Sequence, residues 1–458
     1  MRLSKHFRLA VLFAGLLLLL PTLISAQSVV TGAIGGTITD PSGAVIVGAT
    51  VNLKNGATSE VLSTTSSSGG IYQFTLLKPG TYTLTVAQQG FKQTTQTVEV
   101  LLGQTTASNL KLELGSGAVT VEVTGQGAML QTEDANISSN FDTNQIQNIP
   151  NPGGDITYVA QTAPGVTMNN STGGGFGNFS AFGLPATANL FTINGNDYND
   201  AFLNLNNSGS SNLLLGGNEL QEVAVVSNGY TGQYGRQAGA QIDYSTKSGG
   251  NSFHGDAVYN WTGRYLTAND PVNKAFGGPR PFENNNQWAA GFGGPILKDK
   301  LFFFANTEGI RYIFGSIHTP TVPTTDYETF VLANVAPQGA AVEQFYQNVF
   351  NLYNGAPGIA NAKPNAASCG TLPIESGVCT QTFTQSVSSG NKEWLVAGRV
   401  DYNLNENNKI FGRVKFDRGT QPTYTDPLNP IFNASSYQPE WQSQINWTHT
   451  FSPTLTNQ

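Results

Sequence analysis

Residues that could perform chemistry are few and scattered in this chain. The four histidines (His6, His254, His318 and His449) stand apart, and none has another histidine or a cysteine at metal-site spacing. No H-E-x-x-H motif, P-loop or nucleophile elbow is present. The glycine-rich segment 173–177 follows no predicted strand, which argues against a phosphate loop. The residues therefore predict neither an enzyme nor a cofactor.

Two acidic groups could still offer oxygen ligands or proton transfer. Glu133 and Asp134 are adjacent, and a solvated surface pair is the favoured interpretation. Asp197 and Asp200 lie in the asparagine-rich segment 194–200, whose side chains would suit a hard cation. Their spacing lacks the full calcium-loop pattern, so we interpret the segment as a polar turn and predict no metal site.

Composition favours short strands joined by polar loops. Charged residues make up 11% of the chain, aromatic residues 10%, and 52 of the 458 residues are glycine. Low charge with many aromatic side chains argues against a disordered acidic chain. The formal net charge of −7 is mild and does not indicate a nucleic-acid partner.

Residues 1–26 are interpreted as a secretory signal peptide. Arg2 and Lys5 begin a basic stretch, residues 9–20 are almost entirely apolar, and Pro21 ends the run. A membrane anchor is the alternative, but the run is shorter than the roughly 20 residues that span a bilayer. No other apolar run approaches that length, so a membrane location would have to use strands.

Export bears on the two cysteines, Cys369 and Cys379. In an oxidising compartment a disulfide between them would close one small loop. Two free thiols are the alternative.

Residues 30–114 are predicted to form an antiparallel β-sandwich, because short segments alternate apolar and polar residues between turn residues. The predicted strands are 35–40, 48–53, 70–74 and 82–86. Thr39-Asp40-Pro41-Ser42-Gly43, Leu77-Lys78-Pro79-Gly80-Thr81-Tyr82 and Gly90-Phe91 give the unit a resemblance to the carboxypeptidase regulatory-like domain. The resemblance implies a non-catalytic, transthyretin-like sandwich of a kind often found in front of outer-membrane receptors.

Residues 126–248, after a linker at 115–125, resemble the plug of TonB-dependent receptors. The matching segments, in order, are Gln145 to Pro150, Ala163-Pro164-Gly165-Val166, Phe191 to Asp197, Leu220 to Val225, Tyr230 to Gly235 and Ala240 to Gly249. Asn194 stands where the family motif usually has aspartate. The resemblance implies an α+β plug, and the sandwich in front of it is a feature of Oar-like receptors.

Residues 249–458 alternate as transmembrane barrel strands do, with about 10 residues per strand, apolar side chains facing out and polar ones facing in. The predicted strands are 253–262, 288–296, 301–312, 394–403, 410–417 and 441–451. Long and short connections alternate between them, as expected of long outer loops and short periplasmic turns. A secreted all-β adhesin is the alternative, but such a fold does not require long and short connections to alternate.

Polar residues such as Arg399 and Arg413 are expected to face a lumen that holds the plug. A plugged transporter has 22 strands, and an open edge in lipid would leave backbone groups unpaired. We therefore expect the six strands to be the first part of such a barrel, in a truncated product. The predicted fold class is mainly β: sandwich, plug and partial barrel.

The resemblance implies TonB, with its inner-membrane complex, as a partner that captures an exposed strand by β-addition. The segment that resembles the TonB-contact box is Val119, Thr120, Val121, Glu122, Val123 and Thr124. The alternative is that it is only the last sandwich strand or the first plug strand.

The implied function is energised uptake of a bulky nutrient (an oligosaccharide, a peptide or a siderophore) in the outer membrane, with the sandwich in the periplasm. Its other partners would be membrane lipid, the ligand and a surface lipoprotein, and loop 313–391 is the main candidate for ligand contact. Two alternatives remain: an Oar-like structural or adhesion protein without transport, and a secreted carbohydrate-binding protein.

Overall fold

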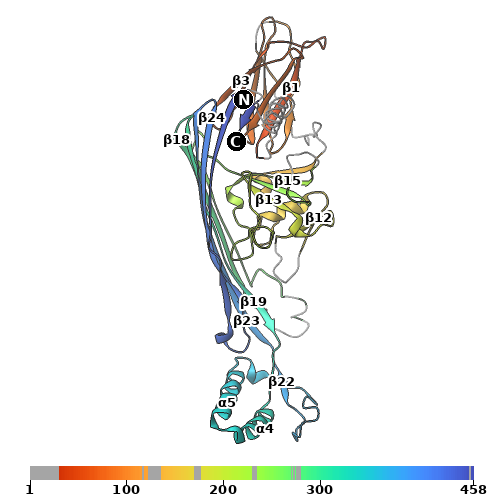
Figure 1. Cartoon of the computed structure of the whole chain (residues 1–458), viewed down its shortest axis with the longest axis vertical. Helices are drawn as coiled ribbons and strands as arrows, with labels where there is room; N and C mark the ends of the chain where they lie inside the picture. Colours follow the sequence, from red (N-terminus) through yellow and green to blue (C-terminus); the bar gives the residue numbers. More distant parts are fainter. Residues whose placement is uncertain are drawn as a thin grey trace, which may run out of the picture.

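The computed structural model describes residues 30–115, 118–121, 136–169, 177–229, 235–269, 271, 274, 280–452 and 455–458. The predicted signal peptide and the Glu133-Asp134 pair lie outside these ranges. Within the described residues, no helix is both long and apolar enough to cross a membrane. Three bodies of β-structure follow one another along the chain: a sandwich, a plug and a long curved sheet (Figure 1).

The sandwich consists of two sheets around one apolar core. The first sheet contains β1 (Gly32–Thr39), β4 (Ile71–Leu77), β7 (Thr105–Ala107) and β8 (Leu110–Lys111). The second has the order β3 (Val61–Thr65), β2 (Thr50–Asn55), β5 (Gly80–Ala87), β6 (Gln93–Val100) and β9 (Ala118–Val121). Alternate residues of β5 are buried between the sheets, because successive strand side chains point to opposite faces.

The four predicted strands pair antiparallel, β1 with β4 and β2 with β5, but the sandwich also contains parallel strands that were not predicted. Strands β7 and β8 run parallel to β1, and β9 runs parallel to β6. These parallel strands are short pieces near the end of the unit, where the chain crosses between the two sheets. Sequence alternation reports the spacing of buried residues and carries no information on strand direction, so it could not indicate these parallel pairs.

The plug combines a mixed sheet with short helices. The sheet has the order β10 (Ile137–Asp142), β15 (Leu220–Asn228), β16 (Gln241–Thr246), β13 (Leu190–Ile193) and β14 (Asn196–Asp197), and β11 (Val166–Met168) pairs with β12 (Phe179–Ala181). Helix α2 (Thr143–Asn148) begins at a capping box formed by Asp142 and Gln145. The 3₁₀ helix η2 (Ile156–Thr162) is buried over most of its length. The plug has its own core, which includes Phe179, Phe191 and Tyr244.

All six predicted barrel segments lie in strands of one antiparallel sheet. The long strands are β17 (His254–Gly263), β18 (Asn284–Leu297), β19 (Leu301–His318), β23 (Gln385–Asn405), β24 (Asn408–Tyr424) and β26 (Glu440–Ser452); short strands β25 (Ala434–Tyr437) and β27 (Leu455–Asn457) complete the sheet. The expected length of about 10 residues was too short, since β19 has 18 residues and β23 has 21. In β23 the additional residues, Gln385 to Lys392, are mostly polar.

The connections keep the predicted alternation of short and long. Residues 298–300 and 406–407 are the short turns, and they lie at the sandwich end of the sheet. The longest connection, residues 319–384, lies at the opposite end (Figure 1). It contains helices α4 (Thr325–Val335) and α5 (Ala340–Asn354) and the strands β20 (Thr321–Pro323), β22 (Thr380–Thr382) and β21 (Lys363–Pro364).

Candidate functional site at the plug, sheet and sandwich junction

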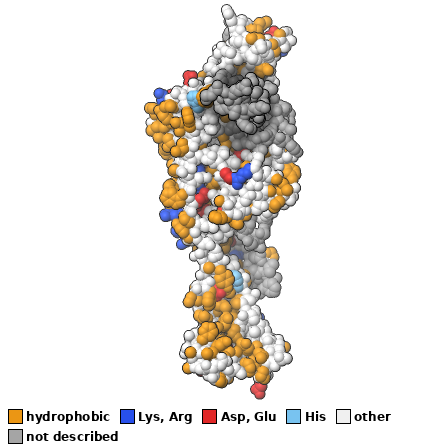
Figure 2. Space-filling model, viewed as in Figure 1, with side chains coloured by type: hydrophobic (Ala, Val, Ile, Leu, Met, Phe, Trp, Pro, Cys, Tyr) orange, Lys and Arg blue, Asp and Glu red, His pale blue; other side chains and the backbone are white. Residues whose placement is uncertain are grey.

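The curved sheet places charge inside and apolar side chains outside. Arg413 and Lys415 of β24 are 2% and 1% exposed, whereas Trp441 and Ile445 of β26 are 78% and 84% exposed. Further exposed apolar side chains are Trp394, Val400 and Tyr402 of β23, Val414 and Phe416 of β24, and Trp447 of β26. Apolar side chains also gather along the outer margin of the sheet in Figure 2. A soluble protein buries its apolar side chains, so this arrangement suits a sheet with lipid outside and the plug inside.

An ion pair joins the sheet to the plug near the centre of this interface. The Nη2 and Nε atoms of Arg413 donate to the two carboxylate oxygens of Glu219, at 2.5 and 3.2 Å. Glu219 ends a one-turn 3₁₀ helix (Gly217–Glu219) directly before β15. Both side chains are buried, and the two-point geometry fixes the plug relative to β24. Arg413 thus faces the plug, as expected from the alternation of its strand.

A second cluster surrounds Lys415 on the same strand. Its Nζ atom donates to the hydroxyl of Tyr198 in the plug, at 2.7 Å, and lies 3.4 Å from carboxylate oxygens of Asp417 and Glu440. Glu440 also accepts a hydrogen bond from Asn207 of the plug. We call the curved sheet that begins with β17 and ends with β27 the wall. Charged side chains of the wall thus contact hydroxyl and amide groups of the plug.

Backbone groups of the plug are also held by wall carboxylates. Glu308 of β19 accepts hydrogen bonds from the amides of Gly216 and Asn218, at 3.0 and 2.6 Å. Glu393 of β23 accepts one from the amide of Ser211, at 2.5 Å. These loops have no helix or sheet partner for those amides, so the wall satisfies them.

Asp401 of β23 is a point where all three bodies meet. Lys78, in the turn between β4 and β5 of the sandwich, donates to Asp401 at 2.6 Å. Arg399 donates to the same carboxylate through Nε and Nη2, at 2.8 and 2.9 Å. Its Nη1 donates to Thr246 Oγ1 at 2.7 Å and to Asn194 Oδ1 at 3.3 Å, both in the plug. One carboxylate, 2% exposed, therefore connects sandwich, wall and plug.

Asn194 lies in the tight turn between β13 and β14. Asn194 and Gly195 both have positive φ, 47° and 83°, and join β13 to β14 as a two-residue hairpin turn. Asparagine tolerates this conformation better than most residues. The sequence motif located the turn, but it gave no sign that Asn194 would contact the wall.

Glu222 of β15 joins the plug to the sandwich. Its Oε1 accepts hydrogen bonds from the Leu102 amide at 2.8 Å and from Asn140 at 2.6 Å. Burial raises the pKa of Glu222 to about 7, and the two hydrogen bonds oppose the rise. The carboxyl group therefore titrates near neutral pH.

The predicted TonB-contact segment is only partly described. Val119 to Val121 lie in β9, paired in parallel with β6, whereas residues 122–124 lie outside the described residues. Among the described residues, no strand pairs with the other edge of β9. Val119 to Val121 therefore lie in an edge strand of the sandwich, as far as the described residues go, and the role of the segment stays a prediction.

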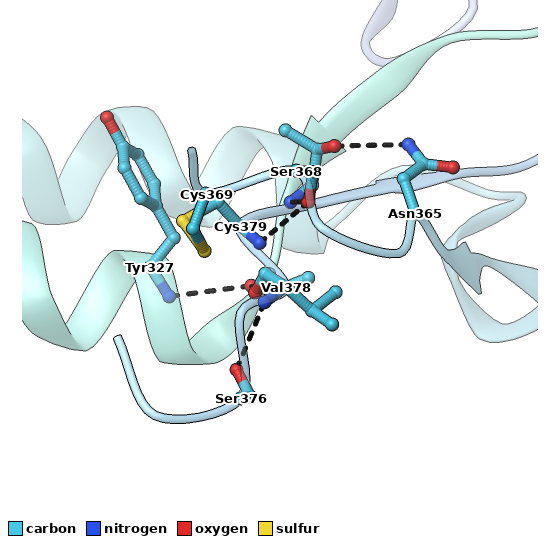
Figure 3. The surroundings of a disulfide bond; sticks show 9 residues. Tyr327, Asn365, Ser368, Cys369, Ser376, Val378 and Cys379 are labelled. Carbon is cyan, nitrogen blue, oxygen red and sulfur yellow. Dashed lines mark hydrogen bonds between the residues drawn. A yellow bond between two sulfur atoms is a disulfide. The ribbon is translucent and has the colours of Figure 1, made fainter. Parts of the chain in front are cut away.

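Cys369 and Cys379 form a disulfide in the long connection at the far end of the sheet. Their Cα atoms are 4.8 Å apart, and both residues are buried. Ser368 Oγ accepts hydrogen bonds from the amides of Cys379 and Thr380 beside the bridge (Figure 3). The bridge thus braces the loop between β21 and β22.

The acidic residues of segment 194–200 are already partnered. Asp197 forms an ion pair with Arg236, and Asp200 accepts hydrogen bonds from the amides of Phe202 and Leu203. The segment is a polar turn, as interpreted. Within the described ranges, no group of three or more His, Cys, Asp or Glu side chains is placed to hold a metal ion.

Family comparisons divide the chain into three parts. The Carboxypeptidase regulatory-like domain matches residues 33–115, the TonB-dependent Receptor Plug Domain residues 130–240, and the Outer membrane beta barrel domain residues 245–458. These matches agree with the predicted fold class of sandwich, plug and outer-membrane barrel strands.

Among known proteins, the chain is 29% identical over 299 residues to the TonB-dependent transporter Oar of Myxococcus xanthus, covering 61% of the chain and 27% of that protein. The chain thus spans about a quarter of that relative. Solved structures it resembles include a ferric enterobactin receptor mutant of Pseudomonas aeruginosa (16% identity, TM-score 0.39, 70% of this chain and 40% of that one). Another is the siderophore receptor PirA of Acinetobacter baumannii (13% identity, TM-score 0.32, 68% and 44%).

The matched plug and barrel families and the relative from Myxococcus xanthus are TonB-dependent receptor, outer membrane and transporter proteins, not enzymes. This agrees with the prediction that the chain is not an enzyme and does not favour a secreted carbohydrate-binding protein. A carboxypeptidase regulatory-like domain, a TonB-dependent receptor plug domain and outer membrane barrel strands thus follow one another along the chain, and in this order the chain is similar to TonB-dependent receptors.

Proposed function

We propose that this chain belongs to a receptor that imports a bulky nutrient, such as an oligosaccharide, a peptide or a siderophore, across the outer membrane. The observation that carries the proposal is the plug, held against the polar face of the sheet by the Arg413–Glu219 pair. The apolar outer face suits lipid, and the plug occupies the lumen side. A plugged lumen admits a large ligand only if the plug moves.

The energy for that movement would come from TonB and its inner-membrane complex. The short turns at the sandwich end support a periplasmic position for the sandwich, because barrel turns on that side are short. Strand β9 supports TonB contact at Val119 to Thr124, since its open backbone edge could accept a partner strand by β-addition.

The outer end of the protein would bind the ligand. The connection 319–384 is the longest of the sheet and is braced by the disulfide. Loops on a rigid scaffold commonly carry binding residues. A surface lipoprotein that delivers the ligand would dock on the same end.

Binding of the periplasmic domain of TonB to the purified full-length receptor tests the proposal. Deletion of residues 119–124 should abolish binding, and Val121→Pro should weaken it at least tenfold, because proline removes a backbone donor from the strand. Val121→Ala is the matched control and should bind within about twofold of the wild type, because it keeps that donor. Unchanged binding of the deletion variant would remove the assignment of this segment.

A further inference from the structure

The sandwich contacts the curved sheet and the plug at the same time. Lys78 meets Asp401 on β23, and Glu60 meets Lys409 on β24 at 2.6 Å. Asn251, before β17, donates through its backbone to the Ala57 carbonyl at 2.9 Å. The β2–β3 and β4–β5 turns of the sandwich therefore contact the end of the sheet that carries the short turns. We call these contacts the rim contacts.

The plug is held by the same group of residues. Asp401 orients Arg399 through two hydrogen bonds, and Arg399 in turn bonds Thr246 of the plug. On the other side, Asn140 and Glu222 of the plug bond Leu102 of the sandwich. The plug is thus clasped between the wall and the sandwich.

The rim contacts are of a kind that water can replace. They are ionic or hydrogen-bonded, and the side chains of Lys78, Lys409 and Glu60 are partly exposed. A cavity of about 620 Å³ lies between the three bodies, lined by residues that include Lys78, Arg399 and Ser248. Partly exposed ion pairs contribute little net stability, so they can separate and form again.

We propose that the sandwich is a latch, which holds the plug in place while docked on the rim and must separate from the rim before the plug moves. The inference rests on the proposed TonB contact, because residues 119–124 begin in β9 of the sandwich and continue toward the plug along the chain. A pull on that segment acts on both bodies together. The rim contacts resist it until the sandwich separates.

A disulfide across the rim tests the latch. A Cβ atom on Gly250 would lie 3.5 Å from the Cβ of Ala57, within the range that disulfides use. The locked receptor is Ala57→Cys/Gly250→Cys in the full-length protein. The matched control is Thr85→Cys/Thr95→Cys, a pair that faces each other on β5 and β6 inside the sandwich. Each carries Ala224→Cys on β15 as a buried reporter of plug movement.

The readout is maleimide labelling of the reporter in cells with and without the inner-membrane complex, together with binding of the TonB domain in vitro. In the control, labelling should rise when the complex is present. In the locked receptor it should stay at the level without the complex, while TonB binding is unchanged. Equal complex-dependent labelling of both receptors would overturn the latch alone. No TonB binding and no complex-dependent labelling in the control would overturn the proposed function and the latch with it.

A second variant tests the latch without a crosslink. Lys78→Met with Lys409→Met removes both ion pairs of the rim but leaves the Arg399–Asp401 pair in place. Labelling of the reporter without the complex should rise at least threefold. Labelling equal to that of the wild type would contradict the latch.

Discussion

The Arg413–Glu219 pair gives a quantitative test of how the plug is held. Glu219→Gln would leave the buried guanidinium of Arg413 without its counter-charge, although the amide oxygen could still accept one hydrogen bond. Removing one partner of a buried pair costs about 3–5 kcal/mol. Both side chains are less than a tenth exposed, so solvent screening does not reduce this figure much. We expect the plug to be destabilised against the wall by about 3 kcal/mol, the lower end of that range.

The assay follows opening of the plug through Ala224→Cys, a reporter buried in β15. In mild urea, the maleimide labelling rate of Glu219→Gln should exceed that of the reporter alone by about 100-fold, since 1.36 kcal/mol corresponds to a factor of ten. The double variant Glu219→Leu/Arg413→Met should restore slow labelling, because an apolar pair of similar volume needs no counter-charge. A rate for Glu219→Gln within threefold of the parent would show that the pair does not hold the plug.

Three further predictions concern other parts of the molecule. The pKa of Glu222 is about 7 in the folded protein against an ordinary 4.5, so its contribution to stability should be present below pH 4.5 and be lost as the pH rises through 7. Glu222→Gln keeps the acceptor oxygen but does not titrate, so its melting temperature should change less with pH over that window. An unchanged slope would assign the pH dependence to another group. Mass spectrometry without reductant should find Cys369 and Cys379 bridged, and their replacement by serine should cost the connection 319–384 about 2–3 kcal/mol and speed its proteolysis. Free thiols at both positions would reject the bridge. Ile445→Arg should destabilise the full-length receptor in bilayers by about 2–4 kcal/mol, whereas Ile445→Leu should be neutral; equal stability of both variants would contradict a lipid-facing position.

Much of the architecture could be predicted because it depends on local periodicity. Alternation along residues 394–403 and 410–417 placed Arg399 and Arg413 on the inner face, and both are buried there against the plug. Strands β3 and β6 were not predicted, although β6 alternates over eight residues. Its buried positions include threonine as well as valine, so hydropathy alone gives a weak signal.

The contacts that join the three bodies could not be predicted from the sequence. Lys78 and Asp401 are 323 residues apart, and Arg413 and Glu219 are 194 apart. No periodic pattern links such positions, and each residue alone resembles an ordinary surface charge. One partial sign of these contacts was present in the sequence, because Arg399, Asp401, Arg413 and Lys415 all fall on the inward face of their strands. It did not identify their partners in the plug and the sandwich.

The polar character of the plug interface has a physical consequence for the proposed uptake. One apolar cluster crosses it, formed by Leu213 and Leu215 of the plug with Ile310, Tyr312 and Leu395 of the wall. The remaining contacts described above are hydrogen bonds and ion pairs, whose groups regain water when they separate. An apolar interface would lose about 25 cal/mol per Å² on opening, with no compensation from water. A plug held by polar contacts is therefore held firmly while its interface is dry and can separate once water enters, and the proposed uptake would require this property.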